Sequence, residues 1–233
     1  MRLRLATYNI HRCFGRDGRF DPGRITAVLR ELDADIIALQ EVESSQDSGV
    51  DILTRFERDT GMQSIAGPTL FSPGATYGNA VLTRFPIDSC RHINLSYRNR
   101  EPRGAMEIRY DSPCRLALLA THLGLNTRER FHQARRLCRA ITQQDDRTYI
   151  LAGDINEWIP FGPSMRCIRR HFGPSPFLAT FPIQLPLLAL DRIMVSQRKR
   201  LLKLRRHNSP LARIASDHLP LVAEIDCPSN STN

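Results

Sequence analysis

Polar side chains that could bind a cation or a phosphate group follow several apolar stretches of this 233-residue chain. They fall in four short segments: 7–11 (Thr-Tyr-Asn-Ile-His), 39–42 (Leu-Gln-Glu-Val), 153–156 (Gly-Asp-Ile-Asn) and 216–218 (Ser-Asp-His). Carboxylates, carboxamides and imidazoles at strand ends are the groups that hard divalent cations and phosphate esters require. Each segment alone is a weak signal. Together with 121–124 and 190–193, they predict one functional site.

Glu41 is the first candidate ligand for a cation. It ends a continuous apolar stretch that begins near Asp35, so its charge needs a partner. Mg²⁺ keeps several waters and is often held by one or two carboxylates plus a substrate phosphate. Glu41 together with Asn9 fits that requirement. The alternatives for Glu41 are an exposed loop carboxylate and a partner for a nearby arginine.

Asp154 and Asn156 lie two residues apart after the apolar stretch Tyr149–Ala152. Gly153 permits a close backbone approach there, so both side chains can face one pocket. A carboxylate in that place can accept a proton from water, and a carboxamide can hold the water or a phosphoryl oxygen. The competing interpretation is an ordinary Asp-x-Asn loop cap.

His122 and His218 each lie at the end or the start of a strand-like segment. A single histidine in such a place is usually a packed core residue, but two beside carboxylate motifs favour phosphate binding or proton donation. Asp191 and Asp217 are the candidate carboxylates that orient these imidazoles. The sequence leaves open which aspartate pairs with which histidine.

The elements that position these residues begin with a strand at Leu3–Ile10, a helix opened by Asp21-Pro22, and a strand at Asp35–Val42. Strand, helix and strand in succession predict a crossover with parallel pairing. Asn9 and Glu41 would then lie near the carboxyl ends of neighbouring strands, where ligands bind in such sheets.

The rest of the chain predicts further elements of both kinds. Helices are expected at Val50–Thr60, at Thr127–Gln143 and near Pro163–Arg170. An antiparallel meander is expected between Gly61 and His122, with strands at Asn79–Arg84, Ile87–Leu95, Arg103–Tyr110 and Arg115–Thr121. Later strands are expected at Tyr149–Ala152, Asp191–Ser196, Leu201–Arg206 and Leu219–Ile225. Two halves of similar order favour an α/β fold: a four-layer α/β/β/α sandwich of two packed mixed sheets flanked by helices. We expect one domain over residues 1–227 and a short polar tail at 228–233.

Composition and charge limit the class of protein. A hydrophobic content of 41% and a charged content of 24% are ordinary for a soluble globular protein and indicate neither a membrane-embedded nor a disordered chain. The formal charge is +9, and only Lys199 and Lys203 among 33 basic residues are lysines. Arginine forks suit phosphate oxygens, which agrees with an anionic partner, although codon bias also explains the ratio. The apolar segment 176–190 contains Pro182 and Pro186 and is too short to span a bilayer, so it predicts a stiffened loop, with a membrane-touching lip as the alternative.

The six cysteines have no Cys-x-x-Cys pair and no short metal-binding spacing. This pattern argues against structural zinc and against a disulfide framework. Met1 is followed at once by a strand pattern, without a signal-peptide apolar region. We therefore expect a reduced, cytoplasmic protein that is monomeric.

With these motifs in place, the sequence resembles the endonuclease/exonuclease/phosphatase superfamily, which includes DNase I-like nucleases, apurinic endonucleases, sphingomyelinases and inositol phosphatases. The resemblance runs from Leu3 to Ile225. Besides the segments above, it rests on 78–82 (Gly-Asn-Ala-Val-Leu), 103–105 (Arg-Gly-Ala), 121–125 and 190–193. It implies a divalent-metal-dependent phosphoesterase with Mg²⁺, for which Mn²⁺ can substitute.

The resemblance also assigns roles. It implies that Asn9, Glu41 and Asp217 belong to the metal site, and that Asp154 activates water while Asn156 holds the phosphoryl group. It implies that Asp191 orients His218, that His218 contacts phosphate, and that His122 is a second phosphate ligand or a general acid. Arg103, Asn79 and His11 are the implied substrate-side residues.

Two departures from the family pattern bear on the substrate. His11 stands where several nuclease members carry an acidic residue, which weighs against a second metal there. His122 stands where apurinic enzymes carry a tyrosine, and the chain is short for a lipid or inositol phosphatase. The chain resembles the compact bacterial phosphodiesterase-like branch of the superfamily. A nuclease on DNA or RNA, an enzyme on phospholipid headgroups, and a non-catalytic binding protein remain the alternatives.

Overall fold

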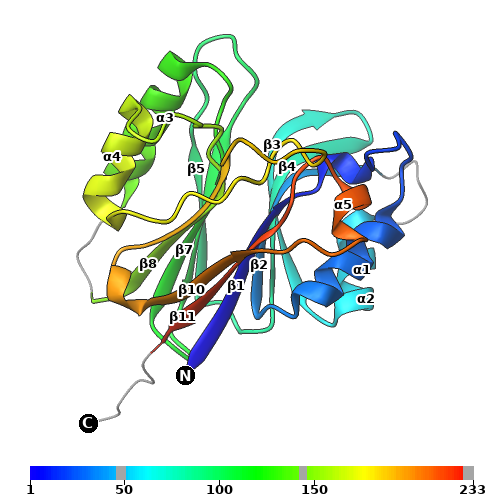
Figure 1. The fold of residues 1–233 in the computed structure, drawn as a ribbon, viewed down its shortest axis with the longest axis horizontal. Coiled ribbons are helices and arrows are strands. Elements are labelled where there is room, and N and C mark those ends of the chain that lie inside the picture. Colours follow the sequence, from blue (N-terminus) through cyan, green and yellow to red (C-terminus); the bar gives the residue numbers. More distant parts are fainter. Residues whose placement is uncertain (46–50, 142–145, 228–233) are drawn as a thin grey trace.

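The computed structural model describes residues 1–45, 51–141 and 146–227. Two β-sheets pack face to face, and helices cover the outer face of each (Figure 1). The four-layer α/β/β/α arrangement expected from the sequence is therefore confirmed. Within the described ranges, no helix is both long and apolar enough to cross a membrane.

The first sheet has six strands, in the order β10-β11-β1-β2-β4-β3. Their bounds are β1 Arg2–Asn9, β2 Ile36–Ser45, β3 Gln63–Ser72, β4 Ala75–Thr83, β10 Leu201–Arg206 and β11 Leu221–Asp226. β1 and β2 are parallel, as the strand-helix-strand pattern predicts, and the other pairs are antiparallel.

The second sheet has five strands, in the order β5-β6-β7-β8-β9. Their bounds are β5 Ser89–Asn94, β6 Gly104–Tyr110, β7 Leu116–His122, β8 Thr148–Asp154 and β9 Asp191–Val195. β7 and β8 are parallel, while the remaining pairs are antiparallel.

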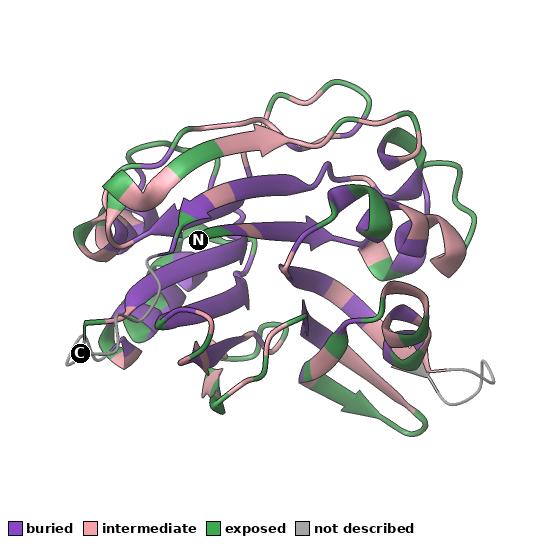
Figure 2. Cartoon of the chain, turned by 90° about the horizontal axis from the view of Figure 1, so that it is seen from below, coloured by how far each residue is buried: buried purple, intermediate pink, exposed green. Residues whose placement is uncertain are grey.

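Each central strand is apolar on both faces because both faces are covered. In β2, Ile36 and Ala38 point into the core between the sheets, whereas Ile37 and Leu39 point toward the helices. Figure 2 shows these strands buried between more exposed outer layers. The continuous apolar stretch before Glu41 is the sequence signature of this two-sided burial.

The helices pack on the outer faces of the sheets. The first sheet is covered by α1 (Pro22–Leu32), α2 (Ile52–Thr60) and the short α5 (Ala212–Ala215), and the second sheet by α3 (Thr127–Ala140) and α4 (Pro163–Phe172) (Figure 1). Short 3₁₀ turns, η1 (His11–Cys13) and η3 (Arg198–Arg200), complete the described elements. The Asp21 side chain caps α1 by accepting a hydrogen bond from the Arg24 backbone N–H, as expected for Asp before Pro at a helix start.

Two expectations about strand order are wrong. β3 lies in a stretch where no strand was expected, and it forms a hairpin with β4 in the first sheet. The antiparallel meander is therefore limited to β5, β6 and β7. β10 and β11 also return to the first sheet, so the two sheets do not correspond to the two halves of the chain. Val50, residues 142–143 of the expected third helix and the tail 228–233 lie outside the described residues.

The expectation from the cysteines is wrong for one pair. Cys114 and Cys227 form a disulfide across 113 residues of sequence. Cys114 precedes β7 in the second sheet, and Cys227 follows β11 in the first, so the bond links the two sheets. Their separation carries no local spacing signal, because tertiary packing alone brings them together.

The topology gathers several strand ends at one edge of the sandwich. Asn9, at the end of β1, is in register with Gln40 in the middle of β2, and His122 is in register with Asp154 at the ends of β7 and β8. β9 starts opposite Asp154, at Asp191. The polar segments found in the sequence therefore meet where the two sheets lie against each other.

Candidate active site

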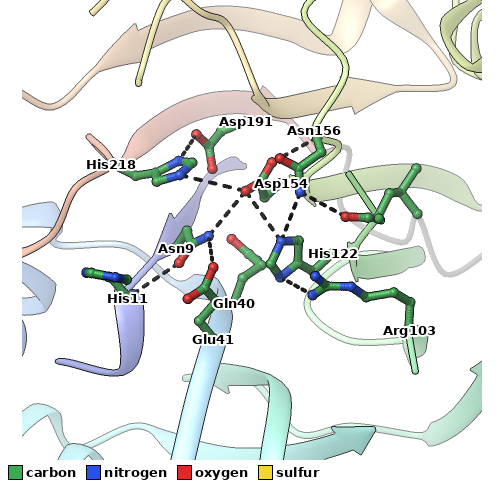
Figure 3. A network of polar contacts seen from close by, with 12 residues as sticks. Asn9, His11, Gln40, Glu41, Arg103, His122, Asp154, Asn156, Asp191 and His218 are labelled. Atoms are coloured by element: carbon green, nitrogen blue, oxygen red, sulfur yellow. Dashed lines mark hydrogen bonds and ion pairs between the residues drawn. The ribbon is translucent and has the colours of Figure 1, made fainter. Parts of the chain in front are cut away.

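The polar side chains at these strand ends form one connected network (Figure 3). They surround a cavity of about 770 Å³. Of the predicted site residues, its lining includes His11, Glu41, Arg103, His122, Asp154, Asn156, Asp217 and His218. Asn9 and Asp191 lie directly behind it through hydrogen bonds to their neighbours.

Asn9 connects the two sheets. Its Nδ2 donates to Glu41 Oε1 at 3.0 Å and to Asp154 Oδ2 at 3.2 Å. Its Oδ1 accepts from the His11 backbone N–H at 3.0 Å. A buried carboxamide that bridges two carboxylates marks the place where negative charges converge, which is where a cation would be favourable.

Glu41 reaches the cavity because β2 is irregular at this point. Its backbone lies in the left-handed region, with φ of 57°, and the pairing of β2 with β4 shifts between Leu39 and Val42. An irregularity of this kind interrupts the alternation of side chains between the two faces of the strand and redirects one of them. Gln40, directly before it, is fully buried and accepts a hydrogen bond from Thr7 Oγ1 at 3.2 Å.

Asp154 and Asn156 share a tight turn, as predicted. The Asn156 backbone N–H donates to Asp154 Oδ1 at 2.9 Å, and Asn156 Nδ2 donates to the Leu123 carbonyl at 2.8 Å. Gly153 has φ of 148°, and a Cβ there would lie 1.8 Å from the Thr121 carbonyl oxygen. Only glycine allows β8 to lie this close to β7 at the turn.

Asp154 lies at the centre of the network. Its Oδ2 is 3.5 Å from His122 Nε2 and 3.8 Å from His218 Nε2, in addition to its contact with Asn9. Burial, reinforced by the nearby Asp191 carboxylate, raises the pKa of Asp154 to about 6. The carboxylate can therefore exchange a proton near neutral pH.

His218 is held by Asp191. His218 Nδ1 lies 2.8 Å from Asp191 Oδ2, and Thr180 Oγ1 donates to the same oxygen at 2.6 Å. Burial alone would lower the pKa of His218, but the charge and hydrogen bond of Asp191 outweigh it and raise the pKa to about 10. His218 is therefore an imidazolium at neutral pH. The Phe181 ring packs on it, with ring centroids 4.8 Å apart.

His122 is in the opposite state. Arg103 NH1 lies 2.9 Å from His122 Nδ1. Burial, followed by the positive charges of Arg103 and His218, holds the pKa of His122 well below its ordinary value. Because arginine can only donate, neutral His122 carries its proton on Nε2, which faces Asp154 Oδ2 at 3.5 Å. Asn156 Nδ2 lies 3.1 Å from the same nitrogen but is a donor, and its hydrogen bond goes to the Leu123 carbonyl. This tautomer is assigned from the hydrogen bonds.

Three predicted residues lie at the edge of the network or outside it. Asn79 is not in the cavity lining, and its Nδ2 donates to the Gly104 carbonyl at 3.1 Å, which ties β4 to β6. Asp217 is half-buried, with its Oδ1 3.9 Å from His11 Nδ1. His11 Nδ1 also lies 3.1 Å from the Phe14 carbonyl.

Sequence reasoning missed several residues of the site. Thr180 and Phe181 support His218 from an irregular loop, where no periodic pattern marks them. Arg12 lines the cavity, pairs with Glu43 and lies over the Tyr77 ring. Its position depends on three successive residues with positive φ, His11 to Cys13. No sequence pattern predicts this backbone conformation in residues other than glycine.

The donor set fits a divalent cation. Ligand atoms of Asp154, Asp191 and His218 all lie within 4.8 Å of one another, although His218 as an imidazolium has no lone pair to offer, so the carboxylates are the available ligands. Asp191 Oδ1 is buried and has no hydrogen-bond partner in the part of the chain that the structure describes. A buried, unpartnered carboxylate oxygen beside a second carboxylate is costly unless a water or a cation satisfies it.

A two-sheet sandwich with carboxylates, amides and imidazoles gathered at one edge agrees with an enzyme that acts on phosphate esters. A sequence profile of the Endonuclease/Exonuclease/phosphatase family matches residues 6–218, and the chain belongs to this family. Members of the family act on phosphate esters and typically use divalent metals.

Individual proteins are similar to this chain in sequence or in fold. The chain is 30% identical to the uncharacterized protein YbhP of Escherichia coli K12, with 96% of each chain covered. Its fold matches an endonuclease/exonuclease/phosphatase from Beutenbergia cavernae with a TM-score of 0.79 at 21% identity, covering 97% of this chain and 72% of the other. It also matches the human Nocturnin catalytic domain, solved with bound sulfate, with a TM-score of 0.71 at 22% identity and coverage of 97% and 95%.

Proposed function

We propose that this protein is a Mg²⁺-dependent hydrolase of phosphodiesters, in which water attacks phosphorus in line with the leaving oxygen. The observation that supports this most strongly is the convergence on Asp154 Oδ2 of Asn9, His122 and His218, from both sheets and within 3.8 Å. Such a cluster combines a proton acceptor with donors that can hold phosphoryl oxygens.

In this proposal Glu41 and Asn9 hold the cation, for which Mn²⁺ can substitute. When bound, the cation neutralises phosphoryl oxygens and stabilises the leaving oxygen, which lowers the barrier by several kcal/mol. For Asn9 to bind the cation, its carboxamide oxygen would have to turn away from the His11 backbone N–H, and its Nδ2 would have to give up its hydrogen bonds to Glu41 and Asp154.

Asp154 takes the proton from the attacking water. A carboxyl pKa of about 6 keeps it ionised at neutral pH and still basic enough to accept that proton. Asn156, fixed by the Leu123 carbonyl, holds the water or a phosphoryl oxygen.

The two histidines have separate roles. Cationic His218 contacts the phosphate charge, and Asp191 and Thr180 keep its ring in place. Neutral His122 donates a hydrogen bond from Nε2 and serves as a phosphate ligand. Its depressed pKa disfavours the alternative role of general acid.

The test is hydrolysis of bis(p-nitrophenyl) phosphate with Mg²⁺ or Mn²⁺. We expect EDTA to abolish turnover, and Asp154→Asn to reduce it by about 10²- to 10⁴-fold, the usual contribution of a general base. Asp33→Asn is the matched control, because Asp33 is an exposed carboxylate in a left-handed conformation that asparagine also adopts. Turnover that survives EDTA or the Asp154 variant would contradict the proposal.

A further inference from the structure

Large exposed apolar side chains cluster on the segments that contribute residues to the catalytic cavity. Four segments at the site end of the sandwich carry them: the β3–β4 hairpin tip, the loop after β7, the loop after β8 and the loop before β9 (Figure 1). The exposed side chains on these segments are Leu70, Phe71, Leu125, Trp158, Ile159, Phe161, Leu185 and Leu187, which we call the apolar rim. Eight of the fourteen large apolar residues exposed in the described ranges therefore lie on these four segments.

The apolar rim does not serve the core. Phe71 is 75% exposed, Leu187 70% and Leu125 69%, so their side chains contribute little packing to the fold. Exposed apolar area costs roughly 25 cal/mol per Å² relative to burial, and contiguous patches of it mark interaction sites. Leu70, Phe71, Leu125 and Trp158 also line the cavity, so the rim is continuous with the site where a phosphate ester would react.

Exposed arginines lie on segments next to the rim, while the cavity lining itself also carries the acidic residues Glu41, Glu43, Glu101 and Asp217. Arg98 and Arg100 are exposed on the loop before β6, and Arg128 is exposed at the start of α3 next to Leu125. Arg12 also lines the cavity, where it pairs with Glu43. Apolar side chains interspersed with arginine favour a surface that is apolar inside and anionic at its boundary.

We propose that the apolar rim docks on a phospholipid bilayer and that the substrate is the phosphodiester of a phospholipid. This inference rests on the proposed function and names the substrate class of the same site. Water would attack phosphorus, one P–O ester bond would break, and the leaving oxygen would take a proton, giving a phosphomonoester and an alcohol.

The composition of the rim favours lipid over nucleic acid. Leu125, Ile159, Leu185 and Leu187 are aliphatic, and bases stack on aromatic rings or on arginine planes, whereas acyl chains accept any apolar side chain. The densest basic stretch, from Arg198 to Arg206, contributes no residue to the cavity lining. The lip expected as an alternative for segment 176–190 is thus one part of a rim that three other segments complete.

The test uses sedimentation with vesicles of phosphatidylcholine and phosphatidylglycerol in a 3:1 ratio. The variant is Phe161→Ser/Leu185→Ser/Leu187→Ser, because these residues belong to the rim but not to the cavity lining. The matched control is Phe131→Ser/Leu202→Ser, which removes exposed apolar side chains from α3 and β10. We expect the unmodified protein and the control to bind vesicles, and the rim variant to bind at least tenfold more weakly.

Two activities are read in parallel. Hydrolysis of vesicle phospholipid, followed by phosphorus NMR, should fall with binding in the rim variant, while hydrolysis of soluble bis(p-nitrophenyl) phosphate stays unchanged. Absence of vesicle binding by the unmodified protein, or equal binding by the rim variant, would overturn the proposal. So would salt-dependent binding of single-stranded DNA without vesicle binding. Failure of the proposed function is distinct, since it removes hydrolysis of the soluble diester while vesicle binding persists.

Discussion

Replacing Asp191 by asparagine should convert His218 from a cation to a neutral imidazole. Asp191 Oδ2 lies 2.8 Å from His218 Nδ1, and its charge and hydrogen bond together raise the pKa of His218 to about 10 against a tendency of burial to lower it. The difference between 6.5 and about 10 corresponds to ~5 kcal/mol of preference for the charged form. The carboxamide in the Asp191→Asn variant has no charge to offer, so burial is then opposed only by the weaker effects of the Asp154 and Asp217 charges, and the pKa of His218 should fall to 6.5 or below.

The assay is an NMR pH titration of the His218 ring in EDTA, with assignment by His218→Gln. The unmodified protein should show no His218 titration between pH 5 and 9, whereas Asp191→Asn should titrate at about pH 6.5 or below, or remain neutral. Hydrolysis of a soluble phosphodiester at pH 7.5 should fall by about 10²- to 10³-fold, as expected when one positioned charge is lost. A His218 pKa that is the same in both proteins would refute the assignment of Asp191 as its partner.

The Asp191→Asn substitution should also change how the free energy of unfolding depends on pH. A histidine whose pKa is raised on folding contributes stability that is fully present below its unfolded pKa of about 6.5 and is lost as the pH rises toward about 10. The free energy of unfolding should therefore fall across that window in the unmodified protein. Asp191→Asn should remove this slope, which urea unfolding at several pH values would measure. The Asp33→Asn control should retain it.

Three further perturbations have defined outcomes. Gly153→Ala should lower the free energy of unfolding by ~3 kcal/mol or more, because its Cβ would collide with a carbonyl of β7. Gly61→Ala, which has a left-handed backbone but open space around its Cβ, should cost only ~1 kcal/mol, and equal losses in urea unfolding would contradict this. Glu41→Gln should weaken Mg²⁺ binding in calorimetry by at least tenfold, and unchanged affinity would remove this residue from the metal site. Cys114→Ser/Cys227→Ser should cost ~3 to 5 kcal/mol, from the loop-entropy model for a link across 113 residues, and a variant as stable as the oxidised protein would contradict that estimate.

The sequence predicts those parts of the fold and the site that have a local pattern of apolar and polar residues. β1, β2 and β8 are buried on both faces, so their continuous apolar stretches and the polar residues after them stand out. β3 was missed because its residues are only partly buried and include Gly67 and Pro68. The placement of β10 and β11 in the first sheet depends on pairing over the whole length of the chain, which no local pattern encodes.

Contacts within the site that join distant segments of the chain also lack a local sequence pattern. The pairing of His218 with Asp191, left open by the residues themselves, follows from the start of β9 lying opposite Asp154. The contact of His122 with Arg103 places a cation beside a histidine where a carboxylate was expected. Thr180 and Phe181 belong to an irregular loop, so only the folded structure brings them to His218.

Hydrolysis of a phosphodiester in ¹⁸O-labelled water with Mg²⁺ tests the proposed chemistry most directly. If Asp154 prepares water to attack phosphorus, mass spectrometry should find one ¹⁸O atom in the phosphomonoester product and none in the alcohol. Asp154→Asn should lose the labelled product, whereas Asp33→Asn should form it at the normal rate. Label in the alcohol, or label in the phosphomonoester at an undiminished rate in Asp154→Asn, would contradict attack of water on phosphorus at this site.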